Sequence, residues 1–171
     1  MSNTSGSFSK ISYNADYLRL ITQSWSLNAT LRGQFANKNL DSVERFDLGG
    51  PNGVRAYPVG EASGDEGWLL SLSASDKISD TLAANVFLDT GSVRLNRNTW
   101  AGWNAGNTNL PNTYQLSGVG IGFDWRFSPM ALLAFSIAAP LGNNPGRDSN
   151  GLNSDGYNNH ARAWLSLNTQ F

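Results

Sequence analysis

Apolar and polar residues alternate along most of this chain, and the alternation predicts β-strands. In residues 25–36, for example, apolar Leu27 and Ala29 alternate with polar Asn28 and Thr30. A period of two places successive side chains on opposite faces of an extended backbone. Seven segments have this strand character: residues 8–21, 25–36, 68–75, 81–93, 114–127, 131–141 and 160–171.

The connections between these segments are short and long in turn. Those after the first, third and fifth segments are tight turns, whereas those after the second, fourth and sixth are long and polar. In a meander all long loops then lie at one end, as in outer-membrane barrels. The pattern predicts an all-β fold, an antiparallel transmembrane β-barrel of seven strands, or eight if the N-terminal residues add one. A soluble up-and-down barrel with an apolar core is the alternative.

Three glycines share one face of the fifth segment. Gly118, Gly120 and Gly122 alternate with apolar Val119 and Ile121. Glycine weakens a strand interior, and it often marks a place where another group approaches the backbone closely. We therefore expect something to lie against this face.

Composition narrows the function classes. The chain has 171 residues, which predicts a single domain over residues 1–171, and its net charge of -1 argues against a nucleic-acid partner. It has no cysteine and one histidine, His160, so thiolate or histidine metal sites and a Ser-His-Asp triad are hard to build. We expect no catalytic residue, metal or cofactor, and no enzyme activity. A mean hydropathy of -0.33 fits both a soluble barrel and a membrane barrel with a polar lumen.

The connection over residues 46–67 is the most distinctive. It is rich in glycine, yet it carries Val54, Arg55 and Tyr57, which argues against disorder. Connections of this length without secondary structure of their own are usually functional or disordered. We therefore predict a functional loop, although spacing alone would leave Arg55 as a solvated charge. At its end, Asp65 and Glu66 beside Gly64 are expected to lie in a solvated turn, and a cation site is the alternative.

The same segment, LGGPNGVRAYPVGEASGDEG, resembles the conserved loop of two-partner secretion transporters. These outer-membrane proteins export and activate haemolysins and filamentous adhesins, and their superfamily includes the barrel-assembly insertase. Four further segments look like the C-terminal strands of this family, in order: FLDTGSV at 87–93, SGVGIGFDWRF at 117–127, AAPLG at 138–142 and a last strand ending in Phe171.

The resemblance implies a sixteen-stranded barrel preceded by periplasmic POTRA domains, of which this chain resembles the C-terminal portion. It implies a translocation pore in the bacterial outer membrane whose partners are a secreted polypeptide, membrane lipid and the barrel-assembly machinery. Copies would associate if the barrel were incomplete. A small structural or passive-channel barrel is the alternative, and a soluble ligand-binding barrel is a more distant one.

The resemblance also implies roles for particular residues. The loop motif is Gly49, Gly50, Pro51, Val54, Arg55, Ala56 and Tyr57. In the family this loop folds into the lumen and its Arg meets an acidic wall residue, here Asp89, with Asp124 as a second candidate partner. Gly118, Gly120 and Gly122 would give the loop room.

Two positions qualify or extend this resemblance. The family usually has Gly where this chain has Ala56, and Ala disfavours a positive φ, so strain at the loop tip is expected. Phe171 resembles the terminal aromatic residue that outer-membrane proteins present to the assembly machinery.

Overall fold

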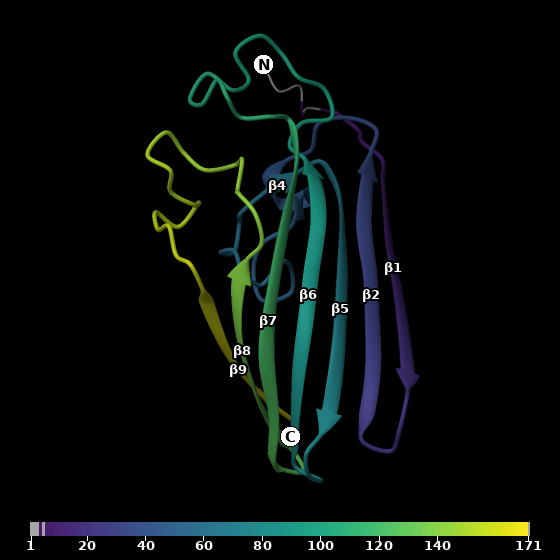
Figure 1. The fold of residues 1–171 in the computed structure, drawn as a ribbon. Coiled ribbons are helices and arrows are strands. Elements are labelled where there is room, and N and C mark those ends of the chain that lie inside the picture. Colours follow the sequence, from purple (N-terminus) through teal and green to yellow (C-terminus); the bar gives the residue numbers. More distant parts are fainter. Residues whose placement is uncertain (1–3, 5, 171) are drawn as a thin grey trace.

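Seven long strands form one antiparallel sheet in the computed structural model, which describes residue 4 and residues 6–170. Strands adjacent in sequence are adjacent in the sheet, in the order β1-β2-β5-β6-β7-β8-β9 (Figure 1). The elements are β1 (Lys10–Leu20), β2 (Trp25–Ala36), the 3-10 turn η1 (Ser42–Glu44), β3 (Phe46–Asp47), β4 (Ser63–Gly64), β5 (Glu66–Lys77), β6 (Leu82–Arg94), β7 (Thr113–Ser128), β8 (Ala131–Pro140) and β9 (Arg162–Thr169). The predicted all-β meander is confirmed.

The long and short connections lie at opposite ends of the sheet. The tight turns β1–β2, β5–β6 and β7–β8 are at the lower end in Figure 1, and the three long connections are at the upper end. The loop boundaries predicted at 46–67 are wrong at both ends. The connection runs over residues 37–65, because Glu66 and Gly67 already pair with Arg94 and Val93 of β6.

The prediction that this connection lacks secondary structure is also wrong. It contains η1 and a two-stranded sheet in which Phe46 pairs with Gly64 and Asp47 with Ser63. This small sheet brings residues 46–47 and 63–64 together and so closes the segment 48–62 into a compact loop. In the described part of the chain, no helix is long and apolar enough to cross a membrane.

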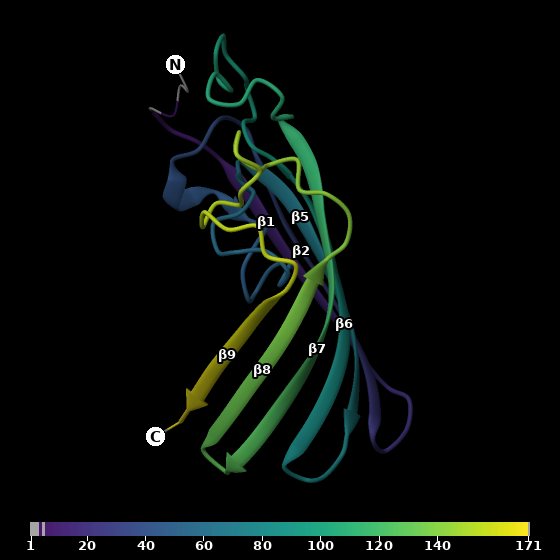
Figure 2. The ribbon, with the colours of Figure 1, turned by 60° about the vertical axis from the view of Figure 1, so that its left-hand side comes forward.

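The sheet is open along its two outer strands. Within the described residues β1 pairs only with β2, and β9 pairs only with β8. An eighth strand from the N-terminal residues is not formed by residue 4 or residues 6–9, and residues 1–3 and 5 lie outside the described part. The seven strands therefore form a curved wall, with the 37–65 loop on its concave side (Figure 2).

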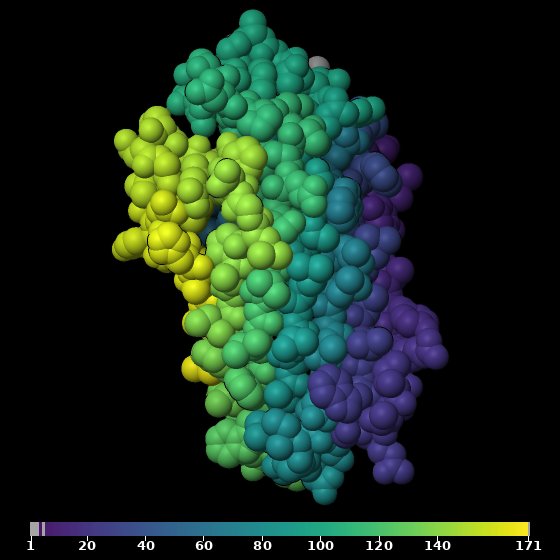
Figure 3. Space-filling view, viewed as in Figure 1, coloured from purple at the N-terminus to yellow at the C-terminus, as the bar shows by residue number. Residues whose placement is uncertain are grey.

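The two faces of the wall differ in chemistry. On the outer face, large apolar side chains such as Val86, Ile121 and Leu165 are exposed by 54%, 46% and 69%. In Figure 3 the segments follow one another across this surface in sequence order, from purple to yellow. Each of the seven strands has exposed apolar side chains, from Tyr17 on β1 to Leu165 on β9, so the outer face is apolar across the sheet.

The buried core lies on the inner face, between the loop and the wall. Loop residues Leu48, Val54 and Tyr57 are at most 1% exposed. They cluster with wall residues of β5, β6, β7 and β8: Leu69, Phe87, Val93, Tyr114, Leu116 and Ala138. The sheet thus obtains its core from its own inserted connection.

Candidate functional site

The tip of the inserted loop is shaped by hydrogen bonds between its own backbone groups. The amide of Val54 donates to the carbonyl of Leu48 at 2.7 Å, and the amide of Gly50 donates to the carbonyl of Tyr57 at 3.1 Å. Gly50 has a φ of +103°, which a side chain would disfavour. At Gly53 a Cβ atom would collide with the carbonyl of Leu48. The glycines of the motif therefore allow the chain to turn back on itself.

Arg55 projects from this tip onto the wall and meets Asp89 of β6. Its Nε donates to Oδ2 at 2.8 Å and its Nη2 donates to Oδ1 at 2.8 Å, so the contact is bidentate. The Arg55 amide also donates to Oδ2, at 3.2 Å. The Asp89 side chain is 1% exposed and that of Arg55 is 19% exposed. Such a shielded pair is strongly directional, because the planar fork matches the two carboxylate oxygens.

Three further side chains hold Arg55, and the sequence did not reveal their roles. The guanidinium carbon lies 3.2 Å from the centroid of the Phe87 ring, a cation–π contact. Ser71 of β5 donates to Asp89 Oδ1 at 2.6 Å and accepts from Arg55 Nη2 at 3.3 Å. Trp164 of β9 donates from Nε1 to the carbonyl of Arg55 at 2.8 Å. Of the three, only Phe87 could be placed near the pair from the sequence, because period-two alternation puts it on the same face of the strand as Asp89.

Asp124, the second partner expected for Arg55, is not within ion-pair distance of it. Its Oδ2 instead accepts a hydrogen bond of 3.4 Å from Nδ2 of Asn85, the inward residue of β6 opposite Gly122. Both side chains line a cavity of about 480 Å³ beneath the loop tip, together with Asn52, Arg55, Trp164 and Ser166. The cavity is polar and lies on the concave side of the wall.

The three wall glycines accommodate three different groups. Only at Gly118 is the neighbour the loop itself, since an added Cβ would lie 2.6 Å from the Cβ of Ala56. A Cβ at Gly120 would collide with the carbonyl oxygen of Ile137 and with the ring of Phe87, and one at Gly122 would lie 2.8 Å from Oδ1 of Asn85. Of the three, Gly118 is the glycine that lies next to the loop, whereas Gly120 and Gly122 lie next to side chains of β6. Gly120 acts indirectly, by letting Phe87 lie flat beneath Arg55.

Ala56 is compatible with the loop tip. Among the described non-glycine residues, a positive φ occurs only at Ala62, with +57°, so the strain expected at Ala56 is absent. Its methyl group is buried, 4% exposed, against Gly118. The neighbouring Tyr57 is also buried, and its hydroxyl has no hydrogen-bond partner among the described residues. Burial raises the pKa of Tyr57 above its usual value.

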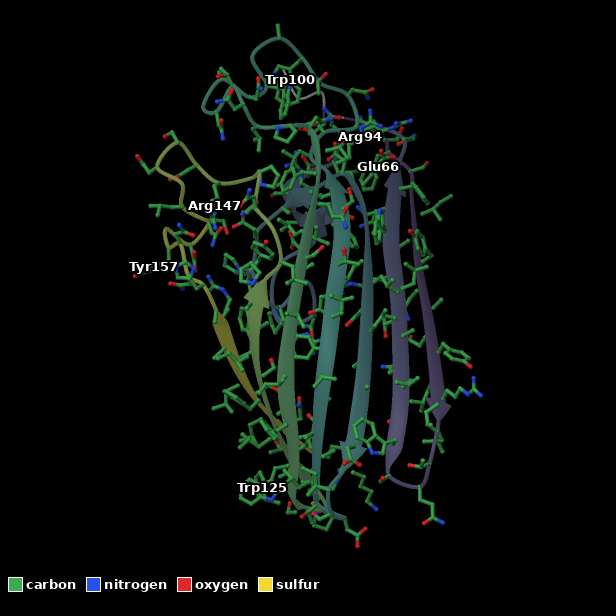
Figure 4. The ribbon with its side chains drawn as sticks, in the orientation of Figure 1. Glu66, Arg94, Trp100, Trp125, Arg147 and Tyr157 are labelled. Atoms are coloured by element: carbon green, nitrogen blue, oxygen red, sulfur yellow. The ribbon has the colours of Figure 1, made fainter. Side chains whose placement is uncertain are left out.

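Asp65 is buried, so its predicted place in a solvated turn is wrong. Its carboxylate is 0% exposed and accepts from the backbone amides of Leu40, at 3.0 Å, and Arg97, at 2.7 Å. Arg45 Nε lies 3.5 Å from Oδ1. Asp65 thus joins the 37–65 loop to the 95–112 loop. Beside it, Glu66 and Arg94 form an ion pair of 3.3 Å at the upper end of the sheet (Figure 4).

Glu61 joins the inserted loop to the third long connection, residues 141–161. Its side chain accepts from Nδ2 of Asn144 at 2.7 Å and from the amide of Ser154 at 2.7 Å, and it is 2% exposed. Two buried carboxylates of one loop therefore link all three long connections. The family resemblance of the strands and the loop motif could not predict these contacts, because they depend on how the three long connections pack against one another.

Phe171, the predicted assembly signal, lies outside the residues that the structure describes. In residue 4 and residues 6–170, no group of three or more His, Cys, Asp or Glu side chains is arranged to hold a metal ion.

A curved, outward-apolar wall of antiparallel strands with its long connections at one end defines a class, the outer-membrane β-barrel proteins. The particular family follows from comparison with known proteins. Residues 2–124 match the profile described as haemolysin secretion/activation protein ShlB/FhaC/HecB, and the chain belongs to this family. Membership places it in the outer membrane of Gram-negative bacteria.

Individual relatives agree with this assignment. The chain is 28% identical over 141 residues to the heme/hemopexin transporter protein HuxB of Haemophilus influenzae strain 86-028NP. The matched region covers 80% of this chain and 24% of HuxB. The same identity and coverage hold for HuxB of strain Rd. The chain therefore spans about a quarter of the length of these curated relatives.

A solved structure has a similar fold. CdiB from Acinetobacter baumannii matches with a TM-score of 0.62 at 18% identity, over 94% of this chain and 26% of CdiB.

Neutralising Asp89 is expected to destabilise the folded protein by about 3–5 kcal/mol, because Asp89→Asn leaves a shielded guanidinium without its counter-charge. The pair Arg55→Met with Asp89→Asn should recover much of this loss. The charge-reversed pair should recover less, because it places a carboxylate over the negative face of Phe87. Denaturant unfolding in detergent measures each variant. Additive losses in the neutral pair would contradict a direct pairing.

Gly120→Ala is expected to force the Phe87 ring out from beneath Arg55 and to crowd the Ile137 carbonyl, at a cost of about 1–3 kcal/mol in unfolding free energy. Gly106→Ala is the matched control, since an added Cβ there meets no atom within 4 Å. Equal unfolding midpoints for the two variants would refute the proposed support of Arg55 by Phe87.

Asp65→Asn is expected to loosen the connection between the first two long loops, because an amide presents one oxygen where the carboxylate presents two. Hydrogen exchange at one or both of the Leu40 and Arg97 amides should accelerate by at least tenfold, which corresponds to about 1.4 kcal/mol. Asp41→Asn, at an exposed position in the same loop, should leave both amides protected. Unchanged exchange at both amides in Asp65→Asn would argue against the link.

Proposed function

We propose that this chain forms the C-terminal part of an outer-membrane pore that exports and activates a large secreted polypeptide. In this proposal residues 1–171 are the last strands of a larger barrel, and upstream strands complete the wall along its open edges. The outer face contacts lipid, and the concave face lines the path of the unfolded polypeptide. The transporter name of HuxB and the family membership support this proposal.

The observation that carries the proposal is the inserted loop held by Arg55 and Asp89. A loop that occupies the concave face narrows the passage, and a single bidentate pair on a rigid strand fixes where it sits. We propose the motif residues Gly49, Gly50, Pro51, Val54, Ala56 and Tyr57 as the scaffold that presents Arg55. Transport on this proposal needs no covalent step and no cofactor, and the chain has no enzymatic role.

Two further roles complete the proposal. Asp124 and Asn85 offer polar contacts to a chain passing through the cavity below the loop. Phe171 is proposed to present its terminal aromatic ring to the barrel-assembly machinery. The polypeptide itself is identified by its chemistry alone, as an unfolded chain that crosses a polar lumen.

Secretion of a co-expressed haemolysin- or adhesin-type polypeptide tests the proposal. Asp89→Asn should lower the partner in the medium by at least tenfold while the transporter remains in the outer membrane. Asp80→Asn is the control, because it removes an ion pair with Lys77 in an exposed turn. Secretion that persists when the gene is deleted, with ion conductance still present in the purified protein, would favour a passive channel instead.

A further inference from the structure

Trp164 connects the last strand to the tip of the inserted loop. It lies half-buried on the inner face of β9, between the exposed Ala163 and Leu165. Its indole N–H donates to the main-chain carbonyl of Arg55 at 2.8 Å. In the sheet, β7 and β8 lie between β6 and β9, so this bond reaches across the concave face.

Arg55 is therefore held from two sides through its own peptide groups. Its amide donates to Asp89 of β6 at 3.2 Å, and its carbonyl accepts from Trp164 of β9. The side chain adds contacts on β6, where the bidentate pair and the Phe87 ring lie, and on the neighbouring β5 through Ser71, but none on β9. The loop tip thus acts as a bridge whose attachment to β6 is strong and whose attachment to β9 depends on one indole.

β9 is held to β8 by a ladder of eight residue pairs, and in the proposed barrel an upstream strand pairs with its other edge. Few contacts of β9 reach across the concave face to the loop. Among the described residues, the side chains of β9 make one other hydrogen bond, from Arg162 to Asp155 at 2.6 Å, and this bond stays within the adjoining connection. Below Trp164, Ser166 and Asn168 face the cavity rather than the loop.

We propose that Trp164 is a positioning residue that couples the anchored loop to β9 and sets the width of the cavity between them. This inference rests on the proposed function, since the cavity matters as part of a transport path. When the indole bond is lost, β9 moves away from the loop tip while Arg55 stays on Asp89. Trp164 then determines how far the passage opens beside the loop, and Asp89 determines whether the loop stays in place.

Distances between pairs of spin labels test the proposal in the intact protein in detergent. The chain has no cysteine, so introduced thiols are the only ones in this chain. One pair, Asn52→Cys with Ser166→Cys, spans the cavity from the loop tip to β9. A second pair, Asn52→Cys with Asn85→Cys, spans it from the loop tip to β6.

Trp164→Phe keeps an aromatic ring but removes the N–H donor. We expect the 52–166 distance distribution to gain a longer population and the 52–85 distribution to stay unchanged. Trp164→His, which retains a ring N–H, should restore the single population at least in part. Trp125→Phe is the matched control, because Trp125 lies at the lower end of the sheet, away from the loop (Figure 4).

An unchanged 52–166 distribution in Trp164→Phe would overturn the proposal. A shift of both distributions would also overturn it, because the loop would then have left β6 as well. These distances do not depend on secretion. Failure of the proposed function would show as normal secretion in Asp89→Asn, whatever the labels report.

Discussion

Insertion of the 37–65 loop into the concave face is the interaction on which the rest of this structure depends. The sheet exposes its apolar residues on the outer face, so it cannot form a core there by itself. The loop supplies Leu48, Val54 and Tyr57 to a buried cluster on the other side. A charge placed beside such a cluster must be compensated, because an unpaired buried ion is costly. Asp89 accepts four hydrogen bonds, three from Arg55 and one from Ser71, which provides this compensation.

The charged contact and the apolar contact specify different things. Apolar burial favours the loop being inside, but it is not directional and would tolerate small shifts along the wall. The bidentate pair fixes one position, and Phe87 sets the plane in which the guanidinium lies. Gly118 and Gly120 allow this arrangement by removing side chains from the wall where Ala56 and Phe87 need space. The apolar residues thus stabilise the inserted loop, and the charged pair fixes where on the wall it lies.

The strands were predictable because each has one apolar and one polar face, and this alternation is local in the sequence. Arg55 and Asp89 could be paired only through the family resemblance, since they lie far apart in sequence and no spacing rule connects them. The roles of Ser71, Phe87 and Trp164 depend on which strands the loop tip crosses, and this depends on the tertiary fold. Asp65 and Glu61 resembled ordinary loop carboxylates for the same reason. The backbone angle at Ala56 also depends on the folded loop, so residue type alone led to a wrong expectation of strain.

The manner in which Asp65 binds its neighbours affects how this protein can vary. Its carboxylate accepts from the main-chain amides of Leu40 and Arg97, and every residue except proline carries such an amide. The attachment therefore does not depend on which side chains the two loops present. The outward surface of the long connections can change in charge, size and hydrophobicity while their junction keeps the same geometry. A protein built in this way can change the exposed surface of its long connections without rebuilding the part of the loop that lies against the concave face.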